Sequence, residues 1–515
     1  PVGSRSAVRA RTPGSLIRYA MASILALDQG TTGSTALIVH QDGTLLGRGY
    51  RELAQHFPRP GWVEHDPRDI FEVTLAAARD ALAAAGERPV GIGITNQRET
   101  AVLWDRATLE PATHAIVWQD RRTSDRCLAL RQAGFAPLIA ERTGLVPDPY
   151  FSATKLEWLL ADPRIRARAV RGELAAGTVD SWVIARLTGG TAFVTDHTNA
   201  SRTMLYGLER RDWDPELLAL FGVPDGLLPT VVASSGIVGE STAAHLGVSL
   251  PIAGIAGDQQ AALFGQGCCA PGTAKNTYGT GTFLLVQAGD RRPRPAAGLL
   301  STAACGPRGE PTFAVEGSVF IAGAAIQWLR DGLGLIAAAA ESEGLARSVS
   351  DTAGVHFVPA FVGLGSPHWE PEARGTITGI TRGTTRAHLV RAGLEAIAFS
   401  SAELLDAMTG DGVTVPALRV DGGATANDWL MQFQADILGL PVERPEMVET
   451  TALGAAGLAG IALGIWRSPD DFLAGRRFSR FEPAMPPEER SRRRAEWDRS
   501  VRAALAWATT RSATG

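Results

Sequence analysis

The chain has 515 residues, of which 45% are hydrophobic, so it is long enough for two domains with a core each. A formal net charge of -4 excludes the strongly basic surface that attracts nucleic acid or an acidic membrane. The 4 cysteines are too few and too irregularly spaced for a disulfide framework, which favours a reducing compartment, and we expect the protein in the cytoplasm.

Residues 1–21 are the first segment, and we expect them to form a disordered N-terminal extension. They contain serines and four arginines but no acidic residue, a composition that loosely resembles an organelle transit peptide. An upstream translation extension explains the same composition, because Met21 directly precedes a segment with the pattern of a strand.

A β-hairpin is expected next. The apolar strands Ile24 to Leu27 and Ala36 to Val39 flank the turn Asp28 to Ser34, which is rich in glycine and hydroxyl groups. Its glycines allow close backbone approach, and its amides and hydroxyls can donate to phosphate oxygens. Asp28, at the strand end, can hold Mg²⁺ directly or through water. Taken alone, the segment is a glycine-rich turn of a common kind.

The middle of the chain repeats the pattern of a strand followed by a polar turn. The strand Gly254 to Ala256 leads through Asp258 into the helix Gln260 to Phe264. A carboxylate at a strand end can point into a cleft as a general base, but an ordinary helix cap has the same sequence pattern. Both interpretations of Asp258 stay open on sequence alone.

Two more such units follow. The strands Asn276 to Tyr278 and Phe283 to Val286 flank a Gly-Thr-Gly turn, and Leu418 to Val420 precedes a polar turn and the helix Trp429 to Leu438. Polar turns in both halves predict two related domains that face one cleft, with a boundary near residue 267.

The longest apolar run, Ala452 to Trp466, is shorter than the ~20 residues that a helix needs to cross a bilayer. Its many glycines favour a helix packed in a core instead. We therefore expect no stable membrane insertion.

The common phosphate-binding motifs are absent. A Walker A loop needs Lys followed by Ser or Thr, whereas Lys155 precedes Leu156 and Lys275 precedes Asn276. The H-R-D and D-F-G triplets of protein kinases are also missing. A bound nucleotide would therefore need another type of loop.

Eight segments in chain order resemble the FGGY carbohydrate kinases, and within that family the enzymes that act on glycerol. The segments are Asp28 to Thr32, Gly61 to Pro67, Gly93 to Glu99, Asp196 to Leu205, Gly257 to Gly265, Lys275 to Gly281, Val420 to Asn427 and Ala452 to Gly460. The resemblance implies an α/β, two-domain actin-like ATPase fold with a ribonuclease-H-like core in each domain. It implies phosphorylation of glycerol to sn-glycerol 3-phosphate by ATP and Mg²⁺ in the interdomain cleft, and a homo-oligomer, dimer or tetramer.

The resemblance also assigns domains and a polyol site. Residues 22–267 would bind the polyol and phosphate, and residues 268–510 the nucleotide. Asp258 resembles the family's general base, which takes the proton of the attacking hydroxyl. The other polyol residues, four that contact hydroxyls and two that form an aromatic wall, are Arg98, Glu99, Tyr150, Gln259, Trp118 and Phe283. Without the resemblance, an Arg-Glu neighbour pair is usually a solvated surface pair, and most such aromatics belong to the core.

On the nucleotide side, the resemblance assigns phosphate and adenosine contacts in both halves and a metal ligand, Asp28. The nucleotide residues are Thr31, Thr32, Gly33, Thr280, Gly323, Gln327, Gly423 and Asn427. Gly323 lies in a stretch of small residues that a tight helix crossing also explains.

The chain departs from the family pattern at Thr35, where relatives usually carry an arginine. Phosphoryl transfer needs positive charge against the developing negative charge, so this loss could slow the reaction unless Arg98 or Mg²⁺ replaces it. Three alternatives remain: a kinase of the same family for a pentulose or sugar acid, an actin-like ATPase without a small acceptor, and an inactive relative. The bulk of Trp118 and Phe283 favours a small substrate.

Overall fold

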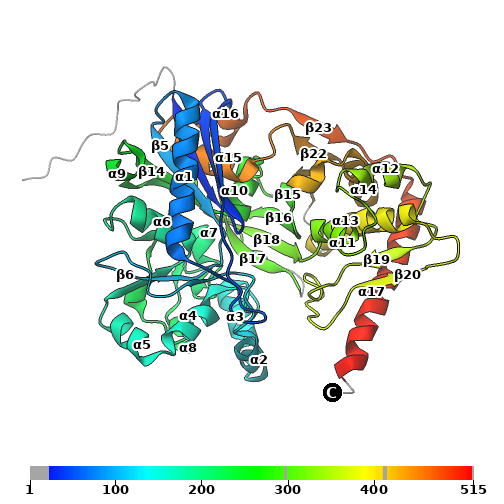
Figure 1. The fold of residues 1–515 in the computed structure, drawn as a ribbon, viewed down its shortest axis with the longest axis horizontal. Helices are drawn as coiled ribbons and strands as arrows, with labels where there is room; N and C mark the ends of the chain where they lie inside the picture. Colours follow the sequence, from blue (N-terminus) through cyan, green and yellow to red (C-terminus); the bar gives the residue numbers. More distant parts are fainter. Residues whose placement is uncertain (1–21, 295–297, 410–413, 513–515) are drawn as a thin grey trace, which may run out of the picture.

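The computed structural model describes residues 22–294, 298–409 and 414–512 (Figure 1). The expected disorder of residues 1–21 therefore concerns a segment outside the described residues. Two large helix-covered β-sheets, one from the first half of the chain and one from the second, are accompanied by small two-stranded sheets. Within the described ranges, none of the helices combines the length and the apolar character that a membrane span requires.

The first sheet has six strands. In spatial order they are β13 (Ser235–Glu240), β14 (Pro251–Gly257), β5 (Gly91–Asn96), β1 (Ser23–Gln29), β2 (Gly33–His40) and β3 (Leu45–Glu52). β1, β2 and β3 form an antiparallel meander, whereas β5 runs parallel to both β1 and β14. The carboxyl ends of β1, β5 and β14 therefore meet at one edge of the sheet.

The second sheet has seven strands. In spatial order they are β17 (Leu300–Cys305), β18 (Pro311–Val319), β16 (Thr282–Gly289), β15 (Ala274–Tyr278), β21 (Leu418–Asp421), β22 (Val442–Pro445) and β23 (Phe478–Phe481). β15, β16 and β18 are antiparallel neighbours, with β17 paired to the outer side of β18, and β21 runs parallel to both β15 and β22. The two sheets thus repeat one arrangement, as expected for two related domains.

Helices cover the first sheet on both faces. α1 (Pro67–Ala85) packs on β2 and β3, and α15 (Thr450–Ala462) packs on β1, β5 and β14. α10 (Asp258–Gly265) packs against α15 and also contacts β15, β16 and β17 of the second sheet. α10 therefore lies between the two sheets.

Shorter elements complete the first half. They are β4 (Glu64–His65), β6 (Val102–Asp105), β7 (Ala115–Ile116), α2 (Ser124–Gln132), α3 (Ala136–Thr143), α4 (Ser152–Leu160), α5 (Pro163–Val170), β8 (Leu174–Gly177), α6 (Val179–Leu187), β9 (Val194–Asp196), α7 (His197–Ala200), β10 (Tyr206–Gly207), β11 (Asp212–Trp213), α8 (Pro215–Leu220), β12 (Thr230–Val232) and α9 (Ala243–Leu246). The remaining α-helices and strands of the second half, which include the long helices α13 and α17, are α11 (Gly323–Asp331), α12 (Glu341–Arg347), β19 (His356–Val358), β20 (Thr376–Thr378), α13 (Arg386–Thr409), α14 (Asp428–Leu438), α16 (Pro469–Leu473) and α17 (Pro487–Ser512).

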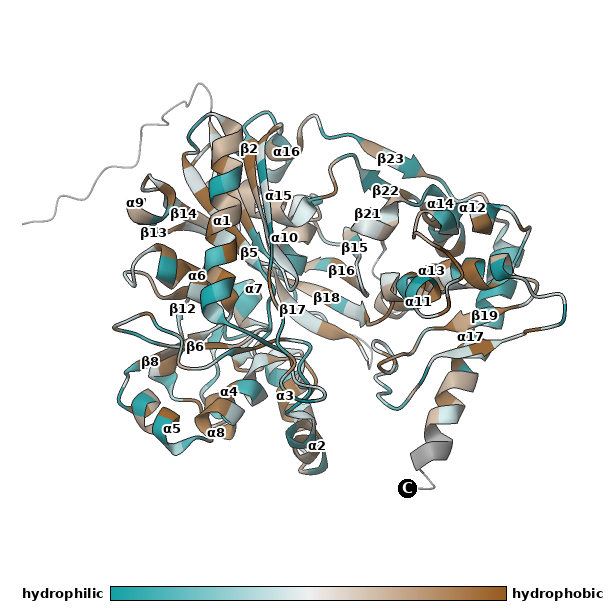
Figure 2. Cartoon of the chain, in the orientation of Figure 1, coloured by the Kyte–Doolittle hydropathy of each residue, from teal (hydrophilic) through white to brown (hydrophobic). Residues whose placement is uncertain are grey.

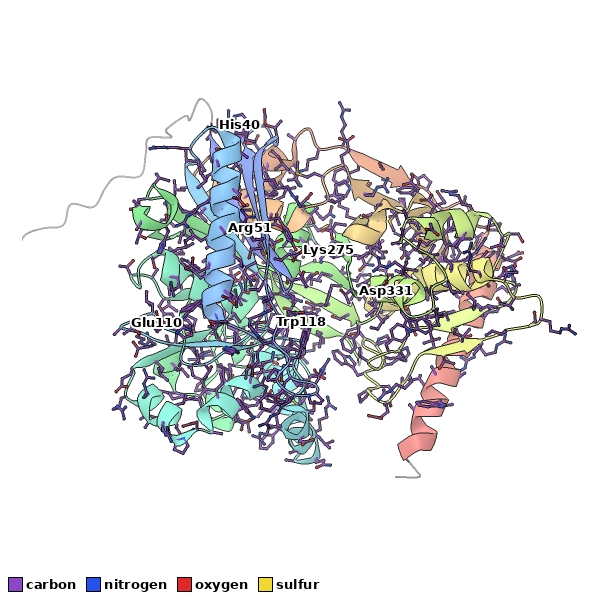
Figure 3. All side chains as sticks on the ribbon, viewed as in Figure 1. His40, Arg51, Glu110, Trp118, Lys275 and Asp331 are labelled. Atoms are coloured by element: carbon purple, nitrogen blue, oxygen red, sulfur yellow. The ribbon has the colours of Figure 1, made fainter. Side chains whose placement is uncertain are left out.

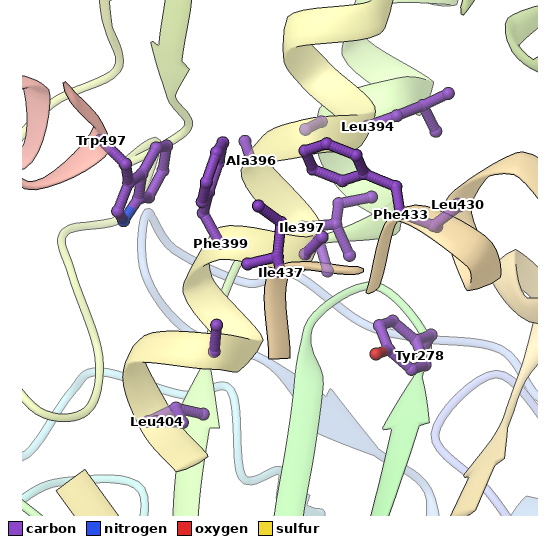
Figure 4. Packing of buried hydrophobic residues seen from close by; sticks show 14 of the residues in the cluster. Tyr278, Leu394, Ala396, Ile397, Phe399, Leu404, Leu430, Phe433, Ile437 and Trp497 are labelled. Atoms are coloured by element: carbon purple, nitrogen blue, oxygen red, sulfur yellow. The ribbon is translucent and has the colours of Figure 1, made fainter. Parts of the chain in front are cut away.

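Strand alternation places separate apolar clusters on the two faces of the first sheet. Leu25 and Leu27 of β1 face the cluster that contains α1, whereas Ile24 and Ala26 face the cluster that contains α15. The apolar colouring of Figure 2 is accordingly dense in the strands and in α15. In the second half, α13, α14 and α17 pack together through aromatic rings, and Phe399 stacks on Trp497 at 5.3 Å (Figure 4).

The predicted elements are confirmed with shifted boundaries. The hairpin turn is shorter than predicted, since Asp28 belongs to β1 and Gly33 to β2. The amide of Gly30 donates to the carbonyl of Gly33 at 2.9 Å and closes this tight turn. The long apolar run forms the buried helix α15, which ends at Ala462.

We expect Gly454→Ala to lower the free energy of unfolding by ~1–3 kcal/mol, because α15 and α10 approach too closely for a methyl group. A Cβ on Gly454 would lie 1.8 Å from the carbonyl oxygen of Ala261. Denaturant unfolding measures the change. Gly344→Ala, on α12 where a Cβ meets nothing within 4 Å, is the control and should leave stability equal or higher. Equal stability of Gly454→Ala and the wild type would contradict this account.

Candidate active site

Asp258 lies at the point where the two sheets meet. It is the first residue of α10, directly after β14, and its side chain is 32% exposed. Its Oδ1 lies 3.1 Å from Nε of Arg98 and accepts a hydrogen bond from the amide of Gln259 at 2.7 Å. Burial raises the pKa of Asp258, although the charge of Arg98 opposes the shift. The carboxylate thus reaches solvent while one side is held by an arginine.

A buried group of alternating charges surrounds Arg98. Its two terminal nitrogens donate to both oxygens of Glu316, at 2.8 and 2.9 Å, and its Nε lies 3.4 Å from Oε1 of Glu99. Nε of Arg202 donates to the same oxygen of Glu99 at 2.9 Å. Arg98 and Glu99 are 1% and 3% exposed, so they are not a solvated surface pair. The structure brings Arg98 and Glu99 together with Asp258.

Two buried lysines support the neighbouring predicted residues. Nζ of Lys155 donates to the carbonyl oxygens of Glu99 and Tyr150 at 2.9 and 2.7 Å, and burial lowers its pKa to about 7. Lys275 donates to the side-chain oxygen of Gln259, and burial lowers its pKa to about 8. Lys275 lies in the central part of the molecule, where the two sheets face each other (Figure 3).

The two predicted aromatic residues have different surroundings. Nε1 of Trp118 donates to Oγ1 of Thr31 at 2.8 Å, and its ring meets that of Tyr150 edge-on at 5.6 Å. Trp118 therefore joins the first predicted phosphate turn to Tyr150, one of the predicted polyol residues. Phe283, half-buried on β16, packs against a different apolar cluster, formed by Leu263, Cys268, Leu285, Ala304 and Ala314.

The first turn exposes polar groups beside a carboxylate. Thr32 is exposed and Thr31 half-buried, whereas Gly33 is buried against β3, where a Cβ would lie 2.6 Å from the carbonyl oxygen of Arg51. Burial, and then the negative charge of Asp258, raise the pKa of Asp28 to about 7. The carboxylates of Asp28 and Asp258 fit a divalent cation, which would relieve the repulsion between them. No set of three or more His, Cys, Asp or Glu side chains suited to a metal occurs among the described residues.

The second predicted phosphate turn contacts α11. The carbonyl oxygen of Thr280 accepts from the amides of Ala322 and Ala324, at 2.8 and 3.1 Å, and the amide of Gly323 donates to Gly279. A Cβ on Gly323 would lie 2.6 Å from the carbonyl oxygen of Gly279, so this position needs glycine. The structure thus brings Thr280 and Gly323 together, and Gln327 is exposed one turn further along α11.

The third turn follows β21. Asn427 caps α14, because its side chain accepts from the amide of Leu430 at 2.9 Å. Gly423 is exposed, and a Cβ there would meet nothing within 4 Å. The preceding Asp421 accepts from Gln266 at 2.9 Å and from the hydroxyl of Thr450. These bonds tie the turn to α10 and α15.

Four residues of this centre were not predicted: Arg202, Lys275, Gln260 and Glu316. The side-chain oxygen of Gln260 accepts from Nη1 of Arg98 at 3.0 Å. Arg202, Gln260 and Lys275 lie in segments that carry the family resemblance, but nothing in their local pattern points to a site. Glu316 gave a signal, because it is a lone acidic residue in the apolar strand β18, and a buried carboxylate needs cationic partners. Its partners, Arg98 and Arg202, could not be identified from the sequence, because they come from distant segments.

Thr35 lies on β2, opposite Asp28 in the strand register. The positive charge of Arg98 does not replace that of the missing arginine, because it is paired with the carboxylate of Glu316. We expect Thr35→Arg to raise kcat by about tenfold, the value of one hydrogen bond to a charged group. Steady-state kinetics measures the change, with Thr35→Gln as an uncharged control of similar length. An unchanged or lower kcat of Thr35→Arg would count against a charge deficit.

Known proteins share this architecture. The model of the FGGY family of carbohydrate kinases, N-terminal domain, matches residues 23–265, and that of its C-terminal domain matches residues 274–463. The chain is 55% identical to the glycerol kinase of Bordetella parapertussis, over 94% of this chain and 97% of the relative. It is 52% identical to glycerol kinase 2 of Thermotoga maritima, over 95% and 99%.

The crystal structure of Plasmodium falciparum glycerol kinase with ADP aligns with a TM-score of 0.88 at 35% identity, and covers 94% of this chain and 98% of that one. The expected two-domain actin-like fold is confirmed. On the matches to both family models and to full-length relatives, the chain belongs to the FGGY family of carbohydrate kinases.

Proposed function

We propose that this chain phosphorylates glycerol with ATP and releases sn-glycerol 3-phosphate and ADP. One observation carries the proposal: a partly exposed carboxylate, Asp258, lies 3.1 Å from a buried arginine whose neighbour Glu99 is also buried. A site that pairs a base with buried hydrogen-bonding charges suits an acceptor with several hydroxyls. The relatives that are 52–55% identical over nearly the whole chain are glycerol kinases, which favours glycerol over a pentulose or sugar acid.

The proposed roles follow from the positions of the groups. Arg98 and Glu99 orient the hydroxyls of glycerol, with Tyr150, Gln259 and the ring of Trp118 around them. Asp258 takes the proton of the attacking hydroxyl, whose oxygen bonds to the γ-phosphorus while the bond to the bridging β-phosphate oxygen breaks. A raised pKa of Asp258 suits this role, because a base accepts a proton best when its pKa is near the working pH.

The nucleotide side of the proposal uses the three turns. Thr31, Thr32 and Gly33 would contact phosphate from the first sheet, and Thr280 from the second. Gly323 and Gln327 would lie near the second phosphate turn, and Gly423 and Asn427 would line the adenosine end. Mg²⁺, held by Asp28, would neutralise charge on the phosphates of ATP. Closure of the two domains, divided near residue 267, would exclude water from the reacting groups.

ADP release with a panel of acceptors tests the proposal. Glycerol should give the highest kcat/KM among glycerol, dihydroxyacetone, xylulose, ribulose and gluconate, and ADP release should stop when no acceptor is present. A higher kcat/KM for a sugar or sugar acid would assign the chain to another kinase of the family. ADP release that does not depend on any acceptor would indicate a simple ATPase.

The proposal includes a cytoplasmic homo-oligomer, a dimer or tetramer. Cys127, Cys268, Cys269 and Cys305 are all free thiols, which suits a reducing compartment. Light scattering after size-exclusion chromatography measures the mass of the assembly, and the mass of one chain, 54.4 kDa, would contradict an oligomer.

A further inference from the structure

Glu316 joins the second sheet to the polyol residues of the first. It lies on β18, and its side chain is fully buried at 0% exposure. Its Oε2 accepts from Nη1 of Arg98 at 2.8 Å, and its Oε1 accepts from Nη2 of Arg98 and Nη2 of Arg202, both at 2.9 Å. One carboxylate therefore holds two arginines that come from different segments of the first half.

Arg202 completes a ring of charges. It follows α7, is 0% exposed, and lies over the ring of Phe151 at 5.2 Å. Its Nη2 donates to Glu316 and its Nε to Oε1 of Glu99 at 2.9 Å, the oxygen that also lies 3.4 Å from Arg98. The order around the ring is Glu316, Arg98, Glu99, Arg202. Each charge lies between two of opposite sign, so no group can turn without losing a charged partner.

Stability is a weak explanation for such a ring. Removing four charges from water costs several kcal/mol for each ion, and well-packed apolar residues often stabilise a core as well or better. Orientation is a stronger explanation, because a bidentate contact fixes the plane of a guanidinium group. Two members of the ring, Arg98 and Glu99, are the ones that the proposed function places against glycerol.

We infer that Glu316 and Arg202 are positioning residues for glycerol, which act by fixing the orientation of Arg98 and Glu99. This inference rests on the proposed function. Neither residue needs to touch glycerol, since the two bonds of Glu316 to Arg98 and the bond of Arg202 to Glu99 set the direction of the groups that would. The second sheet thereby contributes to the polyol site of the first.

Glu316→Gln tests the inference, because it keeps the size of the side chain and removes its charge. An amide has one oxygen and one NH₂ group, and the NH₂ group cannot accept a bond from Arg98. We expect kcat/KM for glycerol to fall on the order of 10²-fold, mainly through a higher KM for glycerol, because small misplacements of positioning groups have effects of this size. KM for ATP should stay within about twofold of the wild type, since a tenfold change already needs 1.4 kcal/mol.

Glu395→Gln is a matched control. Glu395 is a buried carboxylate, 3% exposed, that also contacts two arginines: Arg391 donates to it at 2.8 Å, and Arg493 lies 3.6 Å away. This group lies within the second half, on α13 and α17. Its removal should lower stability and leave KM for glycerol unchanged. Glu316→Asp, which keeps the charge on a shorter side chain, should recover part of the lost kcat/KM.

Arg202→Lys gives an independent test, because it keeps the positive charge but replaces the planar guanidinium group, with its several donors, by a single ammonium group. We expect KM for glycerol to rise. In the double variant with Glu316→Gln, the fold-loss of kcat/KM for glycerol should be smaller than the product of the two single fold-losses, because both residues fix the orientation of Arg98 and Glu99. A thermal shift with ADP shows that each variant is folded. If Glu316→Gln does not fold, Glu316→Asp and Arg202→Lys replace it in the test. Each should raise KM for glycerol and leave KM for ATP unchanged.

The outcomes separate this inference from the proposed function. Absence of glycerol turnover in the wild type would overturn the proposed function, whatever the variants do. Glycerol turnover in the wild type together with an unchanged KM for glycerol in folded Glu316 and Arg202 variants would overturn the positioning role. An equal rise of this KM in Glu395→Gln would do the same.

Discussion

Asp258→Asn is expected to lower kcat for glycerol phosphorylation by about 10³-fold or more, within the range that a general base contributes. The amide keeps the size of the side chain and can still accept the hydrogen bond from Gln259, but it cannot take a proton at neutral pH. Binding of ADP, followed by thermal shift, should be unchanged. Coupled measurement of ADP release gives kcat for both proteins.

The control for this prediction is Asp225→Asn, an exposed carboxylate in the helical turn Asp225–Leu227, which contacts α5 and β8. It should retain the kcat of the wild type. If Asp258→Asn keeps more than about one tenth of the wild-type kcat, proton transfer to Asp258 is not needed and the proposed base is wrong.

Glu99→Gln is expected to raise KM for glycerol on the order of 10²-fold and to weaken discrimination between glycerol and diols. In the wild type, propane-1,2-diol and propane-1,3-diol, each without one hydroxyl of glycerol, should react with kcat/KM lower by about 10⁴-fold. The reason is that a missing hydroxyl leaves buried charges unpaired, and Glu99 is only 3% exposed. The ratio of kcat/KM values for glycerol and each diol measures the effect.

In Glu99→Gln the ratio of kcat/KM for glycerol to kcat/KM for each diol should be smaller than in the wild type, because the substitution lowers kcat/KM more for glycerol than for the diols. Glu157→Gln is the control. Glu157, on α4, pairs with Arg126 at 2.8 Å and does not belong to the ring of charges formed by Glu316, Arg98, Glu99 and Arg202. A wild type that accepts either diol nearly as well as glycerol would contradict hydroxyl recognition by this site.

Local patterns predicted the elements that carry the site. The apolar run before Asp28 became β1, and the strand and helix around Asp258 became β14 and α10. These elements could be predicted because apolar runs bounded by polar turns have few other structures available. The long apolar run became α15, whose glycines permit the close contact with α10 that its composition alone did not reveal.

Pairings between distant segments could not be predicted in the same way. Glu316 is separated by 218 positions from Arg98 and by 114 from Arg202, and no local period connects them. The resemblance assigned Trp118 and Phe283 to one aromatic wall, but only Trp118 has contacts with Thr31 and Tyr150. Side-chain direction at Phe283 depends on the register of β16, which the sequence of that strand does not set by itself.

A crystal structure of the chain with glycerol and ADP tests the central claim most directly. We predict one glycerol hydroxyl within about 2.6–3.2 Å of a carboxylate oxygen of Asp258, the reach of a general base. The other hydroxyls should lie at hydrogen-bond distance from Arg98 and Glu99. Glycerol bound elsewhere, or bound here with Asp258 turned away from all three hydroxyls, would contradict the account.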